Sequence, residues 1–304
     1  MTTATFNYID TSSYTTKPWN KVDGPGTSFT QLPRTRHVSN LRGHFSDYTT
    51  ENAGFAVLVS PASEKSFTDD NAIRRGYYAE VETLLRENLK SVGNVKKVVI
   101  FDHTIRRSVK DSPRQPVLQV HVDQTPAAAE ARVRRHLDAE EAEVLLQGRY
   151  QIINVWRPIS HSASDFPLGV IDWRSTQPED FIAVDLLYPR RDNHSPEVDD
   201  EDDDDRGKEK LPDKESHSST VGYEVKGETM SVAASERHRF YYVKDMQPEE
   251  VMLLKCFDSW GEGMRNGRKG VAVRTPHTAF VDPDTSMKSK GRESIEVRCL
   301  VFYE

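Results

Sequence analysis

The sequence predicts a mainly β protein with flanking helices, an α+β chain whose strands form a sandwich or barrel. Helical patterns cluster in the first half, strand-like runs dominate the second half, and no GxGxxG motif or phosphate-binding loop follows a strand. Nucleotide-binding α/β folds therefore lack support, and a β-sandwich or barrel covered by helices fits better. The 304 residues, 36% of them hydrophobic, are enough for a sizeable core.

Two helices are predicted in the first half. The first begins at Thr68, which can cap it, and ends near Gly93. Its apolar residues fall on one face: Ile73, Tyr77, Val81, Leu84, Leu85 and Leu89. The second helix spans residues 127–146 and follows Thr125 as a cap and Pro126 in the first turn. Its apolar residues are Val133, Leu137, Val144 and Leu145.

Strands are predicted from short apolar or alternating runs bounded by turn residues. They cover residues 54–59, 95–102, 116–123, 150–157, 181–188, 240–243, 271–274 and 294–302. The strands at 95–102 and 116–123 are expected to pair. A short helix is expected at 248–255, between two of the later strands.

We interpret residues 1–304 as one domain, with a helix-containing part over about residues 1–94 and a β-rich core over about 95–304. Residues 192–221 are charged, punctuated by proline and nearly free of large apolar side chains, which predicts a disordered acidic insertion. Much of the net charge of −7 arises there. A solvated loop is the simpler interpretation, and a docking segment for a basic partner is the alternative.

Composition argues against several classes of partner. There is no basic stripe with interleaved aromatic residues, so nucleic acid is not an expected partner. Neither an apolar leader at the N-terminus nor a later bilayer-spanning run is present, which favours the cytoplasm and excludes a membrane partner. Cys256 and Cys299 have no CxxC spacing, so neither disulfides nor a structural zinc site is expected.

The run His121-Val-Asp123 suggests a metal site. Because a strand has period two, His121 and Asp123 share a face with Gln119, while Leu118, Val120 and Val122 point the other way. Two members of a 2-His-1-carboxylate iron site need this arrangement. A second match, His136-Leu-Asp138, falls in the predicted helix, where the two side chains diverge, so His136 is interpreted as a surface residue.

The third ligand has to come from a distant part of the chain. Among the ten histidines His277 is the best candidate, with His103 as its main competitor near a strand end. Fifteen residues after His277, Arg292 and Ser294 open the last strand. An arginine fork with a neighbouring hydroxyl suits the distal carboxylate of 2-oxoglutarate. Arg298 lies on the same face and is the second choice, and a structural pair of Arg298 with Glu296 is the alternative.

Seven motifs make the chain resemble the fungal AsaB-type hydroxylase/desaturase family, also described as gibberellin-desaturase-like. They are His121-Val-Asp-Gln124, Asn154-Val-Trp-Arg-Pro158, Asp172-Trp-Arg-Ser175, Arg239-Phe-Tyr-Tyr242, Lys255-Cys-Phe-Asp-Ser259, Thr275-Pro-His-Thr-Ala-Phe280 and Arg292-Glu-Ser-Ile-Glu-Val-Arg298. The resemblance covers most of the chain, with the acidic insertion as the departure.

The resemblance implies a double-stranded β-helix, the jelly-roll or cupin-like core, with iron(II) held by His121, Asp123 and His277. It also implies 2-oxoglutarate and O2 as cosubstrates and a small molecule of fungal secondary metabolism as substrate. Hydroxylation, desaturation and oxidative ring closure, such as aziridine formation on an amino acid like valine, all remain open. The residues expected in the pocket wall are Asn154, Trp156, Arg157 and Tyr242.

Two alternatives stay open from the sequence. One is a cupin-type metalloenzyme that does not use 2-oxoglutarate. The other is a non-enzymatic interaction protein that recruits a basic partner through the acidic insertion.

Overall fold

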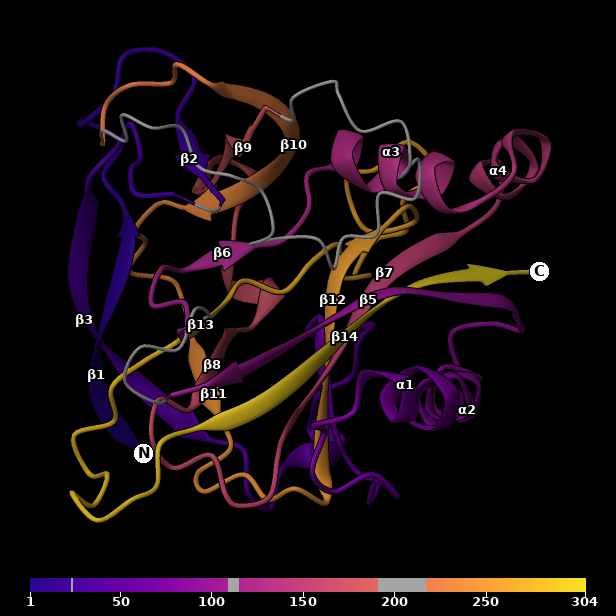
Figure 1. The fold of residues 1–304 in the computed structure, drawn as a ribbon, viewed down its shortest axis with the longest axis horizontal. Coiled ribbons are helices and arrows are strands. Elements are labelled where there is room, and N and C mark those ends of the chain that lie inside the picture. Colours follow the sequence, from indigo (N-terminus) through magenta and orange to yellow (C-terminus); the bar gives the residue numbers. More distant parts are fainter. Residues whose placement is uncertain (23, 109–114, 191–216) are drawn as a thin grey trace.

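Two sheets form the body of the protein, as the computed structural model shows for residues 1–22, 24–108, 115–190 and 217–304 (Figure 1). The nine-stranded sheet has the order β1 (Thr2–Ile9), β3 (Gln31–Asn40), β11 (Phe240–Tyr242), β8 (Leu168–Ile171), β13 (His277–Ala279), β6 (His121–Val122), β10 (Tyr223–Val232), β9 (Phe181–Pro189), β2 (Trp19–Lys21). The five-stranded sheet has the order β4 (Phe55–Val59), β12 (Glu250–Asp258), β7 (Tyr150–Pro158), β14 (Glu293–Tyr303), β5 (Val95–Arg107).

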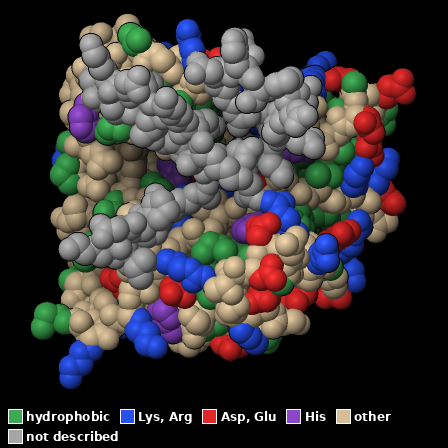
Figure 2. All heavy atoms as spheres, in the orientation of Figure 1, with side chains coloured by type: hydrophobic (Ala, Val, Ile, Leu, Met, Phe, Trp, Pro, Cys, Tyr) green, Lys and Arg blue, Asp and Glu red, His purple; other side chains and the backbone are tan. Residues whose placement is uncertain are grey.

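Four helices lie beside the five-stranded sheet, away from β1 and β3 in Figure 1, and they pack against both of its faces. They are α1 (Asp70–Ala72), α2 (Tyr78–Asn88), α3 (Pro126–His136) and α4 (Ala139–Leu146), and a π-helical turn over Ile73–Tyr77 joins the first two. Figure 2 has the same orientation, and it shows basic and acidic side chains mixed over the right side of the molecule, where the helices lie. No helix among the described residues is long and apolar enough to cross a membrane.

The five-stranded sheet is buried on both faces. Every residue of β7 and β12 is buried, which is the pattern of a sheet covered on both sides rather than of one facing water. One face packs Val155, Leu253 and Val297 against the apolar side of α2. The other face looks toward the nine-stranded sheet, where the polar residues discussed below gather.

The first predicted helix is confirmed in position and in its buried face. All six of its predicted apolar residues are buried, and α2 ends at Asn88, a few residues before Gly93. The prediction of Thr68 as the cap is wrong. Asp69 caps instead, because its carboxylate accepts hydrogen bonds from the amides of Asn71 and Ala72.

The second predicted helix is two helices. Thr125 caps α3 as expected, accepting from the amide of Ala128 at 3.1 Å. Leu137 then adopts an extended backbone, with φ −136° and ψ 153°, and ends α3 before α4 begins. Of its apolar residues, Val133 and Leu145 are buried, whereas Val144 is 65% exposed. His136 is not a surface residue, because its ring stacks on Phe101 with centroids 5.1 Å apart.

Three strand or helix predictions are wrong. Residues 248–255 fall largely in β12 rather than in a helix, and residues 271–274 lie in an irregular segment. The run 116–123 contributes only β6, and Leu118 is 38% exposed. The expected pairing of 95–102 with 116–123 does not occur, because β5 pairs with β14 whereas β6 pairs with β10 and β13.

The N-terminal strands share a sheet with strands from the rest of the chain. β3 pairs with β11, and isolated bridges join Asn7 of β1 to Gln119 and Ile9 to Ala233. The nine-stranded sheet is therefore curled, and an aromatic cluster that includes Phe6 and Phe240 fills this part of it. Of the predicted acidic insertion, residues 192–216 lie outside the described residues.

Candidate metal centre

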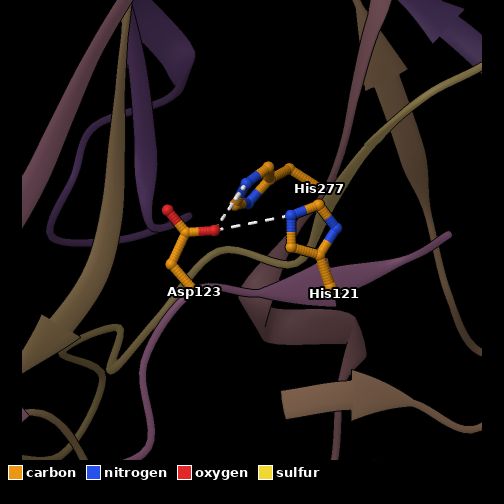
Figure 3. Close-up of side chains that lie close together, drawn as sticks. All are labelled: His121, Asp123 and His277. Carbon is orange, nitrogen blue, oxygen red and sulfur yellow. Dashed lines mark ion pairs between the residues drawn. The ribbon is translucent and has the colours of Figure 1, made fainter. Parts of the chain in front are cut away.

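Cross-strand pairing brings two of the predicted ligands together. His121 in β6 lies opposite His277, the first residue of β13, and the two rings have centroids 4.5 Å apart. Asp123 follows β6 and projects from the same side as His121 (Figure 3). One carboxylate oxygen and one nitrogen from each histidine lie within 4.8 Å of one another. The structure thus assembles all three predicted ligands.

The Nε2 atoms of both histidines face the Oδ1 atom of Asp123, at 3.4 Å for His121 and 3.6 Å for His277. The Nδ1 atom of each ring lies against the backbone carbonyl of the residue two positions earlier, Gln119 at 2.7 Å and Thr275 at 3.0 Å. A carbonyl accepts only from a protonated nitrogen, so this contact places the ring proton on Nδ1. Each Nε2 lone pair is then free to bind a metal.

Oδ2 of Asp123, the oxygen turned away from the histidines, is held by the five-stranded sheet. Asn154 donates to it from Nδ2 at 2.7 Å, and Arg298 approaches it with Nε at 3.4 Å. Burial alone would raise the pKa of Asp123, but the two histidines and Arg298 outweigh it and hold the pKa well below its usual range. Asp123 is therefore a carboxylate, as a metal ligand has to be.

These donors fit iron(II). Two neutral imidazoles and one carboxylate on one side of a centre form the set that binds non-haem iron and leaves further positions open. His103, the competing histidine, lies elsewhere: its Nδ1 is 2.8 Å from the hydroxyl of Tyr78 on α2. Its side of β5 faces away from the three ligands.

A cavity of about 460 Å³, part of it open to solvent, borders the three ligands. Residues from both sheets line it: Thr104, Arg106, Val117, His121, Asp123, Trp156, Leu168, His277, Thr278, Ala279, Arg292, Ser294, Glu296 and Arg298. The predicted common face is confirmed, because Ser294, Glu296 and Arg298 of β14 line this cavity together with Arg292, which precedes the strand by one residue.

Arg292 is a buried cation without a carboxylate partner among the described residues. It is 3% exposed, donates from Nη1 to the carbonyl of Phe166 at 2.7 Å and lies over the ring of Trp156. Its Nε has no hydrogen-bond partner within the described part of the chain. Burial, with the nearby Arg106, lowers the pKa of Arg292 to about 9. Such a cation is suited to bind an anion that enters the cavity.

Arg298 is engaged with protein carboxylates instead. Its Nη1 donates to Asp102 at 2.9 Å and to the Thr104 hydroxyl at 3.0 Å, and its Nη2 donates to Glu296 at 2.7 Å. The structural pair with Glu296 is thus present. Of the two arginines, Arg292 is the better placed to hold a cosubstrate carboxylate.

Of the four residues predicted for the pocket wall, Trp156 is the one that lines the cavity at the three ligands. Asn154 contacts Asp123 instead. Arg157 does not reach the cavity, because alternation along β7 turns it to the outer face, over the ring of Tyr77. Tyr242 lines a separate cavity, with its ring edge on Phe280.

The sequence reasoning missed the contribution of β5. Thr104 and Arg106 line the cavity, and Asp102 pairs with Arg298 behind it. These polar residues recur at every second position of the strand, at 102, 104 and 106, which is the signal that would have indicated an inward polar face.

Comparison with known proteins gives relatives over most of the chain. A family model described as "Oxidoreductase/YMDC permease-like domain" matches residues 6–205 and 208–302. The hydroxylase/desaturase CTB9 of Cercospora beticola is 31% identical over 288 residues, 89% of this chain and 77% of that protein. The hydroxylase/desaturase efuI of Hormonema carpetanum is 28% identical over 283 residues, covering 88% and 83%.

A solved structure of the iron and alpha-ketoglutarate-dependent endoperoxidase NvfI, a protein of Aspergillus novofumigatus, also matches. Its TM-score is 0.76 at 25% identity, and the match covers 99% of this chain and 97% of that one. With its curled sheets and few helices, the chain has the predicted jelly-roll core, and the predicted fold class is confirmed.

Proposed function

The chain belongs to the fungal AsaB-type hydroxylase/desaturase family of oxidoreductases, and we propose on this basis that His121, Asp123 and His277 hold its iron. The protein is an iron(II)- and 2-oxoglutarate-dependent oxygenase that uses O2 and acts on a small molecule of fungal secondary metabolism. The observation that carries the ligand proposal is the convergence of two Nε2 atoms on Oδ1 of Asp123, at 3.4 and 3.6 Å.

We further propose that Arg292 and Ser294 bind the distal carboxylate of 2-oxoglutarate. Arg292 supplies a buried cation that has no carboxylate partner among the described residues, and the almost fully buried Ser294 side chain of β14 lines the same cavity. A charge-assisted hydrogen bond to a carboxylate satisfies such a guanidinium. Trp156, under the guanidinium, keeps the head group in place and excludes water from one side of it.

When bound, iron(II) with 2-oxoglutarate and O2 supplies an oxidant that removes hydrogen from a substrate C–H bond. The chain's own residues orient the ligands: the carbonyls of Gln119 and Thr275 fix the imidazole tautomers, and Asn154 fixes the Asp123 carboxylate. Hydroxylation, desaturation and ring closure differ only after this hydrogen has been removed. Ring closure on an amino acid, a cytoplasmic location and the absence of nucleic-acid partners stay predictions, as does the treatment of residues 1–304 as one domain.

The proposal is tested by measuring succinate formed from 2-oxoglutarate by the iron-loaded protein in air. We expect Asp123→Ala and His277→Ala to lower the rate at least about 100-fold, because each removes a metal ligand. The matched control is His136→Gln, which alters the other His-x-Asp motif and should keep the rate. Equal rates in wild type and Asp123→Ala would contradict the proposed ligands. Substrate turnover without 2-oxoglutarate would instead favour the cupin-type alternative.

A further inference from the structure

Asp123 offers one oxygen to the candidate iron site, and the protein holds the other. We propose that Asn154 and Arg298 are positioning residues that clamp Oδ2 of Asp123, so that this carboxylate binds the metal through Oδ1 alone. The inference rests on the proposed function, because it takes His121, Asp123 and His277 as the iron ligands.

The two clamping residues are neighbours in the five-stranded sheet. Asn154 of β7 and Arg298 of β14 are directly paired in the strand register. Their side chains reach across to the nine-stranded sheet and meet the same oxygen, at 2.7 Å from Asn154 Nδ2 and 3.4 Å from Arg298 Nε. The shorter contact is the one from Asn154. One sheet thus carries the ligand and the facing sheet sets its orientation.

Asn154 is not explained by packing or stability. It is fully buried, and its Oδ1 has no hydrogen-bond partner among the described residues. A buried amide oxygen without a hydrogen-bond donor destabilises the fold, and an apolar side chain at this position would avoid that cost. The amide orientation is also determined, because turning its oxygen toward Asp123 would set two acceptors against each other. The hydrogen bond to Asp123 is therefore the role that explains an amide side chain at this position.

Arg298 is fixed by its own partners. Asp102 accepts from Nη1 at 2.9 and 3.1 Å, and Glu296 accepts from Nη2 at 2.7 Å, so the guanidinium cannot swing away from Asp123. The chain of contacts runs from Asp102 on β5 through Arg298 on β14 to Asp123 after β6. Arg298 is one positive charge beside three carboxylates, those of Asp102, Glu296 and Asp123. A bound divalent metal ion would supply the two positive charges that balance this group.

A clamp on Oδ2 has a chemical consequence. A carboxylate with both oxygens free can bind a metal through one oxygen or through both. Binding through both would occupy a position that the two-histidine, one-carboxylate site leaves open for cosubstrate and O2. By holding Oδ2, Asn154 and Arg298 keep that position available.

The test uses Mn(II) and Co(II) as probes of the protein without cosubstrate. Asn154→Leu replaces the amide by an apolar side chain with the same branching and number of heavy atoms, and the smaller Asn154→Ala is the second variant should the first not fold. We expect either variant to bind Mn(II) about 10- to 100-fold more weakly, as loss of a residue that orients a metal ligand does. We also expect the visible spectrum of bound Co(II) to change, because the carboxylate can then bind through both oxygens.

The matched control is Ile152→Val, on the same strand but in an apolar cluster away from the ligands, and it should leave both readouts unchanged. Wild-type affinity and an unchanged Co(II) spectrum in the Asn154 variant that folds would overturn the clamp. If the wild type bound no Mn(II), or if Asp123→Ala bound it equally well, the proposed function would fail instead. The two failures are thus distinguished.

Discussion

Two arginines on one strand face have opposite surroundings, and this difference decides their roles. Arg298 lies among Asp102, Glu296 and Asp123, whereas Arg292 has a backbone carbonyl and an aromatic ring as neighbours. A buried cation without an anion costs folding free energy, and it regains that energy when an anion arrives. On the proposed assignment, Arg292 would contribute to cosubstrate binding at the expense of stability.

This assignment gives Arg292→Met opposite effects on stability and binding. We expect 2-oxoglutarate to bind the Mn(II)-loaded variant about 10- to 100-fold more weakly, since hydrogen bonds to charged groups contribute about 1.5–3 kcal/mol. Without cosubstrate, the free energy of unfolding should equal or exceed that of the wild type. Calorimetric titration and urea unfolding measure the two quantities. Unchanged 2-oxoglutarate affinity would contradict the assignment.

His136 gives a pH dependence. Burial, with the charges of Arg132 and Arg135 nearby, lowers the pKa of His136 to about 4, below its ordinary value of 6.5. Between these values the unfolded chain binds the proton and the folded chain does not, so stability is lost as pH falls from about 6.5 to 4. His136→Phe keeps a ring against Phe101 and should lose less stability over this range. Urea unfolding at pH 7 and pH 5 checks this, and an identical loss in both proteins would refute it.

At the residue scale the sequence predicted the candidate site well. Strand periodicity placed His121 and Asp123 together, and the helical position of His136 correctly separated the second motif from the first. Arg157 shows the limit, because the motif around it does not reveal which face of β7 meets the cavity. Which face of β7 meets the cavity depends on its partner strands and on α2, which covers the opposite face. All of these lie outside the motif in the sequence.

Among the elements, β12 gives the most informative wrong prediction, because a helix was expected over residues 248–255. Its residues Met252, Leu253, Leu254 and Lys255 are good helix formers, and proline precedes them. Both faces of the strand are buried, so the alternation that would have indicated a strand is absent. Pairing with β4 and β7 outweighs the local preference. Neither partner can be identified from the sequence of β12 itself.

β12 also anchors the segment that carries His277. Lys255 is fully buried and donates to Glu51 at 2.8 Å, to Asp258 at 2.7 Å and to the carbonyl of Ala272 at 3.0 Å. Arg149 completes this cluster, donating to the same two carboxylates. The amide of Thr275 bonds the carbonyl of Lys255 at 2.6 Å. Residues 271–276 are thus fixed without forming a strand.

Removing the cation from this cluster should be costly. We expect Lys255→Met to lower the free energy of unfolding by about 3–5 kcal/mol, because it leaves the buried Asp258 carboxylate under-compensated. Lys269→Met, at an exposed position, is the control. Adding Asp258→Asn to Lys255→Met should cost less than the sum of the single effects, because the two residues interact directly. Denaturant unfolding of the wild type, Lys255→Met, Asp258→Asn, the double variant and the Lys269→Met control measures these effects, and a change below about 1 kcal/mol for Lys255→Met would contradict the role.

For the whole molecule, function depends on how the two sheets face each other. The nine-stranded sheet supplies His121 and His277 and leads into Asp123, while the five-stranded sheet supplies Arg292, Arg298 and Asn154. The sequence predicted the fold class, but of the fourteen strands among the described residues it predicted only β4, β5, β7, β9, β11 and β14, with part of β6. It could not give the pairing of β6 with β13, whose partners lie far apart in the chain, nor the facing of the sheets, because both arise from tertiary contacts.

The central claim is that the three ligands bind iron(II) in a form that also binds 2-oxoglutarate. It is tested by adding 2-oxoglutarate to the iron(II)-loaded protein without oxygen and following visible absorption. A weak charge-transfer band should rise to saturation in the wild type, require much more 2-oxoglutarate in Arg292→Met and be absent in Asp123→Ala. A wild-type protein without the band, or an Asp123→Ala protein with it, would contradict the claim.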